Sequence, residues 1–381
     1  MLLRADTVLT GRELLRPGWI DIAAGTVRAV GAGPAPTPPD VDLGVATVVP
    51  GFVDTHVHGG AGGNFSAADP AETVTAVELH RRHGTTTLVA SLVTAGPAEL
   101  LRQVESLARD VRAGVLDGIH LEGPWLSPLR CGAHQPSLMR DPEPAEIDAV
   151  LRAGDGTIRM VTIAPERAGA MAAIEQLASS GVVVAVGHTE ATYDQARAAI
   201  DAGATIGTHV FNAMRPIDRR EPGPIVALLE DPRITVELIT DGVHIDPAIY
   251  RFVAKTIGPE RISLITDAMA ATGMSDGRYY LGPLAVDVAG GVARVAGTDT
   301  IAGSTATMDQ VLRFAVAHSG APRNEALLAA VAQTSVNPAR ALGLPASAGL
   351  TAGAAADMVM LDNDLAVIGV LRKGHWVVTP A

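Results

Sequence analysis

The sequence predicts an α/β fold: a parallel (β/α)8 barrel, or TIM barrel, with a small β-sandwich domain formed by both chain ends. Two observations predict it. Eight short apolar runs alternate with helical patterns along the middle of the chain, and both ends hold strand-like pieces without a convincing helix. A doubly wound open sheet would explain the alternation almost as well, and the count of eight strands favours the barrel.

The barrel strands are predicted from β-branched runs between residue 48 and about residue 270. The segment 69–84, between the first two runs, has an acidic first turn and stops at Gly84, as an amphipathic helix does. Strands joined by helical crossovers pair in parallel, so all eight carboxyl ends meet at one face. In chain order the runs are VVPGFVDTHVH, TTTLVASLV, VLDGIHLEG, IRMVTIAPE, VVVAVGHT, TIGTHVFNA, ITVELITDGVH and RISLITDAM.

The predicted domain boundaries follow this change of pattern. Residues 1–47 plus 344–381 are expected to form the small β-domain, because chain termini often lie close together. Residues 48–343 are expected to form the barrel, with a β-hairpin inserted near 277–298, after the eighth strand.

The composition narrows the classes of partner. The chain of 381 residues has a formal net charge of −12 at pH 7, which argues against a nucleic acid or an anionic membrane surface. Its only cysteine, Cys131, excludes an intramolecular disulfide and favours a reducing compartment. No apolar run approaches the ~20 residues of a membrane helix, and Arg4 and Asp6 precede any signal-like segment. We expect a cytoplasmic protein.

Six of the eight predicted strands end in a side chain that can bind a metal or transfer a proton. Because side chains alternate along a strand, His56 and His58 point the same way. One histidine at a strand end is more often structural, but so many at one face of a barrel predict a shared metal centre. Such ligands suit zinc and its first-row neighbours, including iron, cobalt and manganese. The residues are His56, His58, Glu122, His188, His209, His244 and Asp267.

Two neighbouring metals often need a bridging anion, and Glu122 is the candidate for that role. A carbamylated lysine is another known bridge, but the only lysines, Lys255 and Lys373, lie in a helical segment and in the tail. His120 shares the strand face of Glu122, and an interior histidine is the preferred interpretation for it. Asp267 could take a proton from metal-activated water and pass it to a leaving amine. A helix N-cap or a further metal ligand is the alternative for Asp267.

The motifs around these residues form a recognisable set. PGFVDTHVHG, HLEGPW, GHT, THVFNAM, DGVH and TDAM, with GLTAGAAADMVML near the C-terminus, resemble the amidohydrolase superfamily. HLEGPW followed by GAHQP, and FNAM followed by REPG, resemble its N-acetylglucosamine-6-phosphate deacetylase family. The resemblance runs nearly from end to end. It implies metal-dependent hydrolysis of the N-acetyl group of N-acetylglucosamine 6-phosphate to glucosamine 6-phosphate and acetate, in amino-sugar catabolism and cell-wall recycling.

The resemblance also implies a set of metal ligands. Glu122, His188 and His209 would hold the principal metal. Glu122 would be shared with a second ion, held by His56 and His58. Members that lack this histidine pair work with one metal, so one or two ions per subunit are expected, most naturally zinc.

The remaining matches concern the substrate and proton transfer. Asp267 corresponds to the catalytic acid and base, and His134 of GAHQP to a substrate-binding histidine that polarises the acetyl carbonyl. Arg220 and His244 correspond to the pair that binds the phosphate. In some relatives this arginine comes from the neighbouring subunit, which implies a homodimer. Three further positions match substrate contacts, the last two through the backbone: Asn212, Ala213 and Ile301.

Two residues depart from the expected pattern. Arg219 replaces a small residue before Arg220, and Cys131 lies in the loop expected to close over the sugar. The cysteine is interpreted as incidental, with a redox-sensitive loop as the alternative. N-acetylgalactosamine 6-phosphate is the closest alternative substrate, followed by an N-acyl amino acid or a cyclic amide. A metal-free assembly or signalling barrel is disfavoured, because the expected ligands are present.

Overall fold

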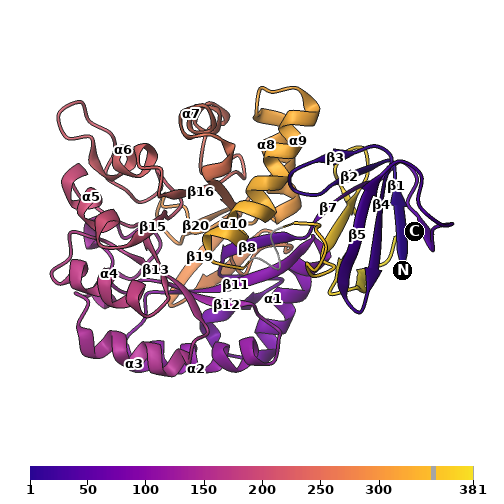
Figure 1. Ribbon diagram of the computed structural model, residues 1–381. Helices are drawn as coiled ribbons and strands as arrows, with labels where there is room; N and C mark the ends of the chain where they lie inside the picture. Colours follow the sequence, from indigo (N-terminus) through magenta and orange to yellow (C-terminus); the bar gives the residue numbers. More distant parts are fainter. Residues whose placement is uncertain (345–348, 381) are drawn as a thin grey trace.

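In the computed structural model, which describes residues 1–344 and 349–380, the middle of the chain forms the predicted parallel barrel (Figure 1). Neighbouring strands follow one another in chain order, each parallel to the next. A bridge between Val57 and Ala268 links the first strand to the segment after the last, which closes the barrel. The strands are β8 (Phe52–Val57), β11 (Thr85–Val93), β12 (Gly118–Glu122), β13 (Ile158–Ile163), β14 (Val183–Val186), β15 (Ala204–Gly207), β16 (Thr235–Ile239) and β17 (Ile262–Ile265).

Helices cover the outside of this barrel (Figure 1). Their apolar faces pack on the strands in one core, to which α2 contributes Val104 and Leu107 and β12 contributes Ile119. No helix in residues 1–344 and 349–380 is both long and apolar enough to cross a membrane. The helices are α1 (Pro70–Arg82), α2 (Pro97–Arg112), α3 (Pro144–Gly154), α4 (Ala170–Ser179), α5 (Tyr193–Asp201), α6 (Gly223–Glu230), α7 (Pro247–Ile257), α8 (Met308–His318), α9 (Arg323–Val331) and α10 (Asn337–Ala341), with 3-10 turns at Phe65–Ala67, Pro128–Arg130, Pro136–Leu138 and Pro259–Arg261 and a π-helical turn at Ala332–Val336.

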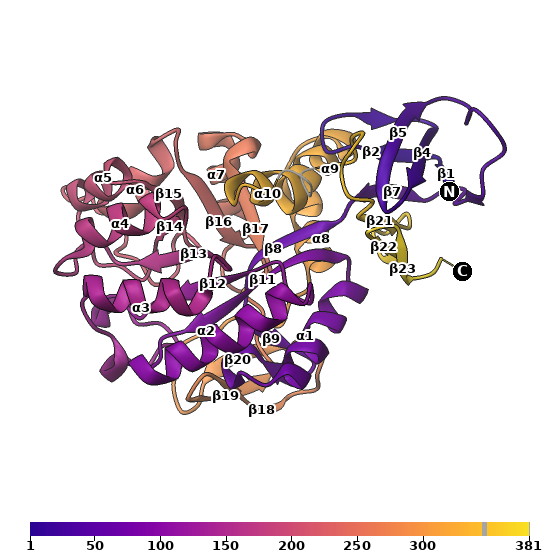
Figure 2. The same ribbon diagram turned by 60° about the horizontal axis from the view of Figure 1, so that its bottom comes forward.

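The two chain ends form the predicted β-sandwich beside the barrel, and Figure 2 shows both termini there. One sheet has the strand order β5, β4, β1, β6, and the other has the order β23, β22, β21, β7, β2, β3. Apolar side chains such as Leu3, Ile20, Val48 and Met358 give this domain a core of its own. The strands are β1 (Leu2–Ala5), β2 (Thr7–Leu9), β3 (Leu14–Leu15), β4 (Gly18–Ala23), β5 (Thr26–Ala32), β6 (Val41–Asp42), β7 (Thr47–Pro50), β21 (Met358–Leu361), β22 (Val367–Arg372) and β23 (His375–Val378).

The predicted domain division, 1–47 plus 344–381 against 48–343, stays a proposal. β7 pairs with β2 and with β21, so it belongs with the smaller domain, and the chain enters the barrel at β8. Residues 345–348 and 381 of the predicted C-terminal segment lie outside the described residues.

The insertion after the eighth strand has three strands, one more than the predicted hairpin. β18 (Gly277–Leu281), β19 (Leu284–Ala289) and β20 (Val292–Val295) form an antiparallel sheet. Gly290 and Gly291, in the second turn, have the positive φ angles of 58° and 74° that a tight hairpin needs. A two-glycine turn inside the segment was therefore a signal for a third strand. A further short pair, β9 (Gly59–Gly60) and β10 (Gly63–Asn64), follows β8.

Gly84 joins α1 to β11 with a backbone that few side chains tolerate. Its φ is +92°, and its N–H donates to the carbonyl of Arg81 at the helix end. A Cβ at this position would lie 2.7 Å from the ring of Phe52 and 2.8 Å from Val359. Gly181 ends α4 with a similar φ of +78°, but its Cβ would meet open space. Alanine substitutions at the two positions therefore distinguish the cost of backbone strain, which both share, from the cost of overpacking, which only Gly84 has.

We expect Gly84→Ala to lower the free energy of unfolding by about 2–5 kcal/mol, because a left-handed alanine costs ~1–2 kcal/mol and overpacking a core adds ~1–3 kcal/mol. Gly181→Ala should show only the first of these losses. Urea denaturation of both variants beside the parent protein measures the difference. Equal losses in the two variants would contradict the close packing at Gly84.

Candidate active site

The carboxyl ends of the barrel strands bring the predicted polar residues to one face. His56 lies within β8, His58 directly follows it, and Glu122 is the last residue of β12. Three more residues follow their strands by two positions: His188 after β14, His209 after β15 and Asp267 after β17. Their φ angles are +46°, +24° and +49° in that order. This left-handed backbone is uncommon outside glycine and persists only where surrounding contacts hold it, often at functional sites.

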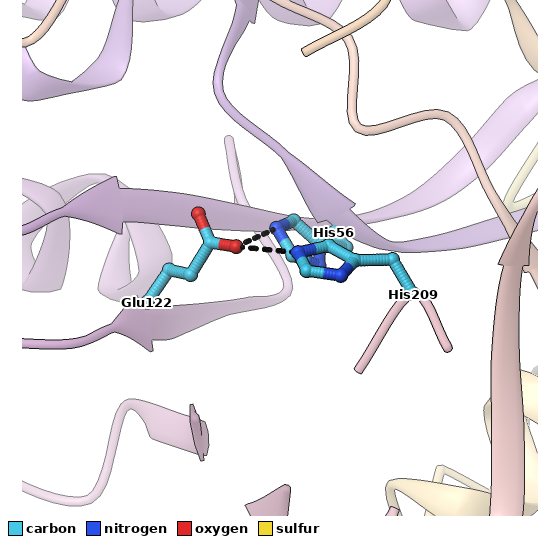
Figure 3. Close-up of side chains that lie close together, drawn as sticks. All are labelled: His56, Glu122 and His209. Carbon is cyan, nitrogen blue, oxygen red and sulfur yellow. Dashed lines mark hydrogen bonds and ion pairs between the residues drawn. The ribbon is translucent and has the colours of Figure 1, made fainter. Parts of the chain in front are cut away.

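Glu122 is the centre of the site. It is 3% exposed, and Nε2 of five histidines lies within 3.3 Å of one of its carboxylate oxygens. Figure 3 shows two of these rings, His56 and His209, directed at the same oxygen. The distances from Oε1 are 3.0 Å to His188, 3.0 Å to His209 and 3.3 Å to His56, and those from Oε2 are 3.1 Å to His58 and 3.1 Å to His134.

This donor set fits a divalent cation. Nε2 of His56, which faces Glu122, is buried and makes no hydrogen bond within residues 1–344 and 349–380. Buried polar atoms are normally paired, so this nitrogen points to a partner that the protein chain does not supply. Imidazole and carboxylate groups are the ligands that zinc and its neighbours prefer. Three groups place their ligand atoms within 4.8 Å of one another: His56, Glu122 and His209; His56, His58 and Asp267; and Glu122, His134 and His188.

Oxygen atoms behind two histidines orient them as ligands. Nδ1 of His188 lies 2.9 Å from the backbone oxygen of Arg130, and Nδ1 of His58 lies 3.2 Å from that of Ser91. A carbonyl oxygen only accepts hydrogen bonds, so each Nδ1 carries a proton, and Nε2 is the ring nitrogen that is left to bind a cation. Metal-binding histidines are commonly held in this way.

The neighbouring charges in the site shift the pKa values of Asp267 and His58 in the direction opposite to burial. Burial alone would raise the pKa of Asp267, but the imidazoles of His56 and His58 lower it to about 2. Burial would also lower the pKa of His58, but its hydrogen bonds to Asp267 and Glu122 raise it to about 9. Oδ1 of Asp267 lies 3.1 Å from Nε2 of His58. An ionised carboxylate therefore stands beside the ligand cluster, where it can accept a proton.

The cluster opens into a cavity of about 280 Å³. Leu281 of the three-stranded insertion, and Asp299 and Thr300 of the loop that follows it, form part of the wall. Gly132, one residue after the half-buried Cys131, also lines the cavity. Five of the residues predicted to contact substrate lie in this wall: His134, Asn212, Ala213, His244 and Ile301.

Among the described residues, Arg220 is the predicted substrate residue that does not line the cavity. It is exposed in the loop between β15 and α6, beside the equally exposed Arg219. Its backbone N–H donates to the carboxylate of Asp218 at 2.9 Å. The fold of one chain therefore does not bring Arg220 to His244.

His120 has the interior position that was predicted for it. It is buried, with Nδ1 2.9 Å from Oγ of Ser91 and Nε2 2.8 Å from Oγ1 of Thr162.

The helix N-cap alternative for Asp267 is wrong, because the described chain continues from Asp267 into a turn and not into a helix.

Two carboxylates behind the site were not predicted, the buried Glu237 and the partly buried Asp241. Glu237 of β16 accepts a hydrogen bond from Oγ1 of Thr55 at 3.1 Å, and its Oε2 lies 3.5 Å from Nδ1 of His56. Asp241 accepts a hydrogen bond from Nδ1 of His244 at 2.8 Å and so orients that ring. The motif DGVH, which places Asp241 three residues before His244, was a usable signal. Glu237 and His56 come from strands far apart in the sequence, and no local pattern connects them.

Comparison with known proteins identifies the family. The model of the amidohydrolase family matches residues 47–377. The chain belongs to the amidohydrolase family. This family is metal-dependent, in keeping with the ligand groups around Glu122. The family that the sequence motifs predicted is confirmed.

Individual relatives match most or all of the chain. The N-acetyl-D-glucosamine-6-phosphate deacetylase of Mycobacterium smegmatis, solved as a D267A mutant in complex with N-acetyl-D-glucosamine 6-phosphate, is 74% identical; the match covers 100% of this chain and 99% of that one, with a TM-score of 0.99. The N-acetylgalactosamine-6-phosphate deacetylase of Escherichia coli O157:H7 is 39% identical over 97% of this chain and 98% of its own length. The N-acetylglucosamine-6-phosphate deacetylase of Danio rerio is also 39% identical, over 88% and 86%.

We expect the purified protein to bind a divalent cation and Glu122→Gln to bind it at least about tenfold more weakly, because the amide lacks the negative charge that the ligand groups share. Elemental analysis after dialysis against graded metal concentrations measures this. His375→Gln, at an exposed histidine of β23, is the control and should match the parent protein. Unchanged metal binding in Glu122→Gln would contradict the site.

Proposed function

We propose that this chain hydrolyses the N-acetyl group of N-acetylglucosamine 6-phosphate to glucosamine 6-phosphate and acetate, in amino-sugar catabolism and cell-wall recycling. The observation that carries the proposal is the buried cluster around Glu122, which opens into a cavity that Asp267 and His134 line. The Mycobacterium smegmatis relative supports the substrate, because its structure holds this sugar phosphate. The Escherichia coli O157:H7 relative makes N-acetylgalactosamine 6-phosphate the second candidate. A phosphorylated substrate and a single cysteine both suit the cytoplasm.

The cation of the proposed enzyme is zinc, with one or two ions per subunit. Imidazole-rich ligand sets with a carboxylate suit zinc, and iron, cobalt and manganese are alternatives. When bound, the ion would supply Lewis-acid chemistry, which activates water and polarises the amide carbonyl. Its ligands would be Glu122, His188 and His209, with His56 and His58 joining Glu122 around a second ion.

The residues of the chain account for the proton transfers. Asp267 is ionised and lies beside the ligand cluster, so its carboxylate can take a proton from the attacking water. The same carboxyl then gives that proton to the amide nitrogen as the C–N bond breaks, which frees the amine and leaves acetate. His134 supports the carbonyl oxygen by a hydrogen bond as negative charge develops on it.

Other residues of the cavity suit a sugar phosphate. Burial alone would lower the pKa of His244, but its hydrogen bond to Asp241 raises it, which favours the positive charge that a phosphate needs. Asn212, with the backbone at Ala213 and Ile301, would contact the rest of the substrate. Binding energy from these contacts, remote from the reacting carbon, positions the amide.

Asp267→Asn should lower kcat for N-acetylglucosamine 6-phosphate about 10²–10⁴-fold, because an amide can neither accept nor return the proton. Metal content should stay near that of the parent protein. Acetate release and metal content are measured on one sample, with Asp364→Asn, at an exposed position of the small domain, as the control. The relative solved with its sugar phosphate carries D267A, which supports the choice of this residue. If turnover survives in Asp267→Asn, the mechanism is wrong.

We also propose that the enzyme is a homodimer in which Arg220 completes the phosphate site of the neighbouring subunit. Within the described residues, no arginine or lysine lines the cavity that contains His244. Arg220 lies exposed outside it, in a loop that also exposes 49% of the apolar Ile217. The guanidinium group of Arg220 from a second subunit would supply the positive charge that the phosphate site lacks.

Mixed dimers test this arrangement. Arg220→Ala and Asp267→Asn should each be nearly inactive alone. In a mixed dimer, one site has its own Asp267 and receives the partner subunit's Arg220, so random pairing of equal amounts should restore about a quarter of the parent activity. Distinct affinity tags on the two chains would confirm that mixed dimers form. Mixed dimers without activity would contradict the shared site.

A further inference from the structure

Hydrogen-bond donors face Nδ1 of His134, in contrast to the other anchored histidines of the site. The backbone N–H of Thr94 donates to this nitrogen at 3.2 Å, and Oγ1 of Thr94 lies 3.1 Å from it. Behind His58 and His188, Nδ1 meets a backbone carbonyl oxygen instead. Thr94 directly follows β11 and is 1% exposed, so water does not compete for the contact.

These contacts decide where the proton of His134 lies. A backbone N–H only donates, so Nδ1 of His134 accepts with its lone pair. A neutral imidazole carries a single proton, which is then on Nε2. The hydroxyl of Thr94 faces the same lone pair and acts as a second donor. Nε2 points into the site, 3.1 Å from Oε2 of Glu122, and a nitrogen that bears a proton has no lone pair for a cation.

Gly123 makes room for this arrangement. It follows Glu122, has a φ of +91°, and a Cβ there would lie 2.5 Å from Oγ1 of Thr94. A side chain at this position would push the hydroxyl away from His134. Glycine at this position therefore allows both the turn after β12 and the contact of the Thr94 hydroxyl with His134.

We propose that Thr94 is a positioning residue that holds His134 as the Nε2–H tautomer, the form that the hydrogen bond to the substrate carbonyl in the proposed function requires. The role toward the carbonyl rests on the proposed function, whereas the tautomer rests only on the contacts at Nδ1. The assignment removes His134 from the ligand group that it forms with Glu122 and His188. Cations are left to histidines whose Nε2 is unprotonated.

Nitrogen-15 NMR of the zinc-loaded enzyme, with ring-labelled histidine, reads the tautomer without any substrate. The signals of His134 are identified by their loss in His134→Gln. We expect Nδ1 of His134 without a directly bonded proton and Nε2 with one at neutral pH, and the reverse tautomer would overturn the proposal. Because no sugar phosphate is present, a failure of the proposed deacetylase activity would leave this result unaffected.

Thr94→Val removes the hydroxyl and keeps both the backbone N–H and the shape of the side chain. We expect kcat to fall about two- to tenfold, the effect of one hydrogen bond, with KM and zinc content unchanged. Thr94→Ser should restore kcat, because it returns the hydroxyl. An unchanged kcat in Thr94→Val would show that the hydroxyl does not help to position His134. A loss of zinc would show that Thr94 supports the metal site instead.

Discussion

The buried charge of Glu122 is the constraint on which the rest of the site depends. A carboxylate removed from water costs several kcal/mol unless cations or hydrogen-bond donors replace the water. Burial alone would raise the pKa of Glu122, but the imidazoles of His56, His134 and His188 lower it well below its ordinary value. A parallel barrel suits this task, because it brings side chains from several strand ends to one point. The left-handed backbone at His188 and His209 directs two of these rings inward.

The hydrogen-bond partner of Nδ1 determines what each histidine of the site can do. A backbone oxygen behind His58 or His188 leaves Nε2 free to bind a cation, whereas the N–H of Thr94 behind His134 makes Nε2 a donor. A carboxylate behind His244 favours the charged ring that a phosphate requires. In the proposed function, five histidines around one carboxylate and a sixth in the cavity wall would therefore bind metal, polarise a carbonyl and bind a phosphate, each histidine with a role of its own.

The features predicted from the sequence are those that short-range patterns encode. Alternation along a strand placed His56 and His58 on one side, and the helix-stop signal at Gly84 matches the end of α1. The barrel rule then brought residues from distant strands, such as Glu122 and His209, to one face before any distance was known. Pattern reasoning missed what depends on packing between strands. Glu237 behind His56 lies on a distant strand, and Thr94 behind His134 directly follows another strand, so no motif connects either pair. The exposure of Arg220 depends on a loop.

The most direct test of the account is the ratio of kcat/KM for acetate release from N-acetylglucosamine 6-phosphate and from unphosphorylated N-acetylglucosamine, with and without a chelator. Two charge-assisted contacts to the phosphate, worth ~1.5–3 kcal/mol each, predict a preference of about 10²–10⁴-fold for the phosphorylated sugar. Chelation should abolish release from both sugars, because the ligand groups around Glu122 then lack their cation. Equal kcat/KM on the two sugars, or full activity in the presence of the chelator, would contradict the account.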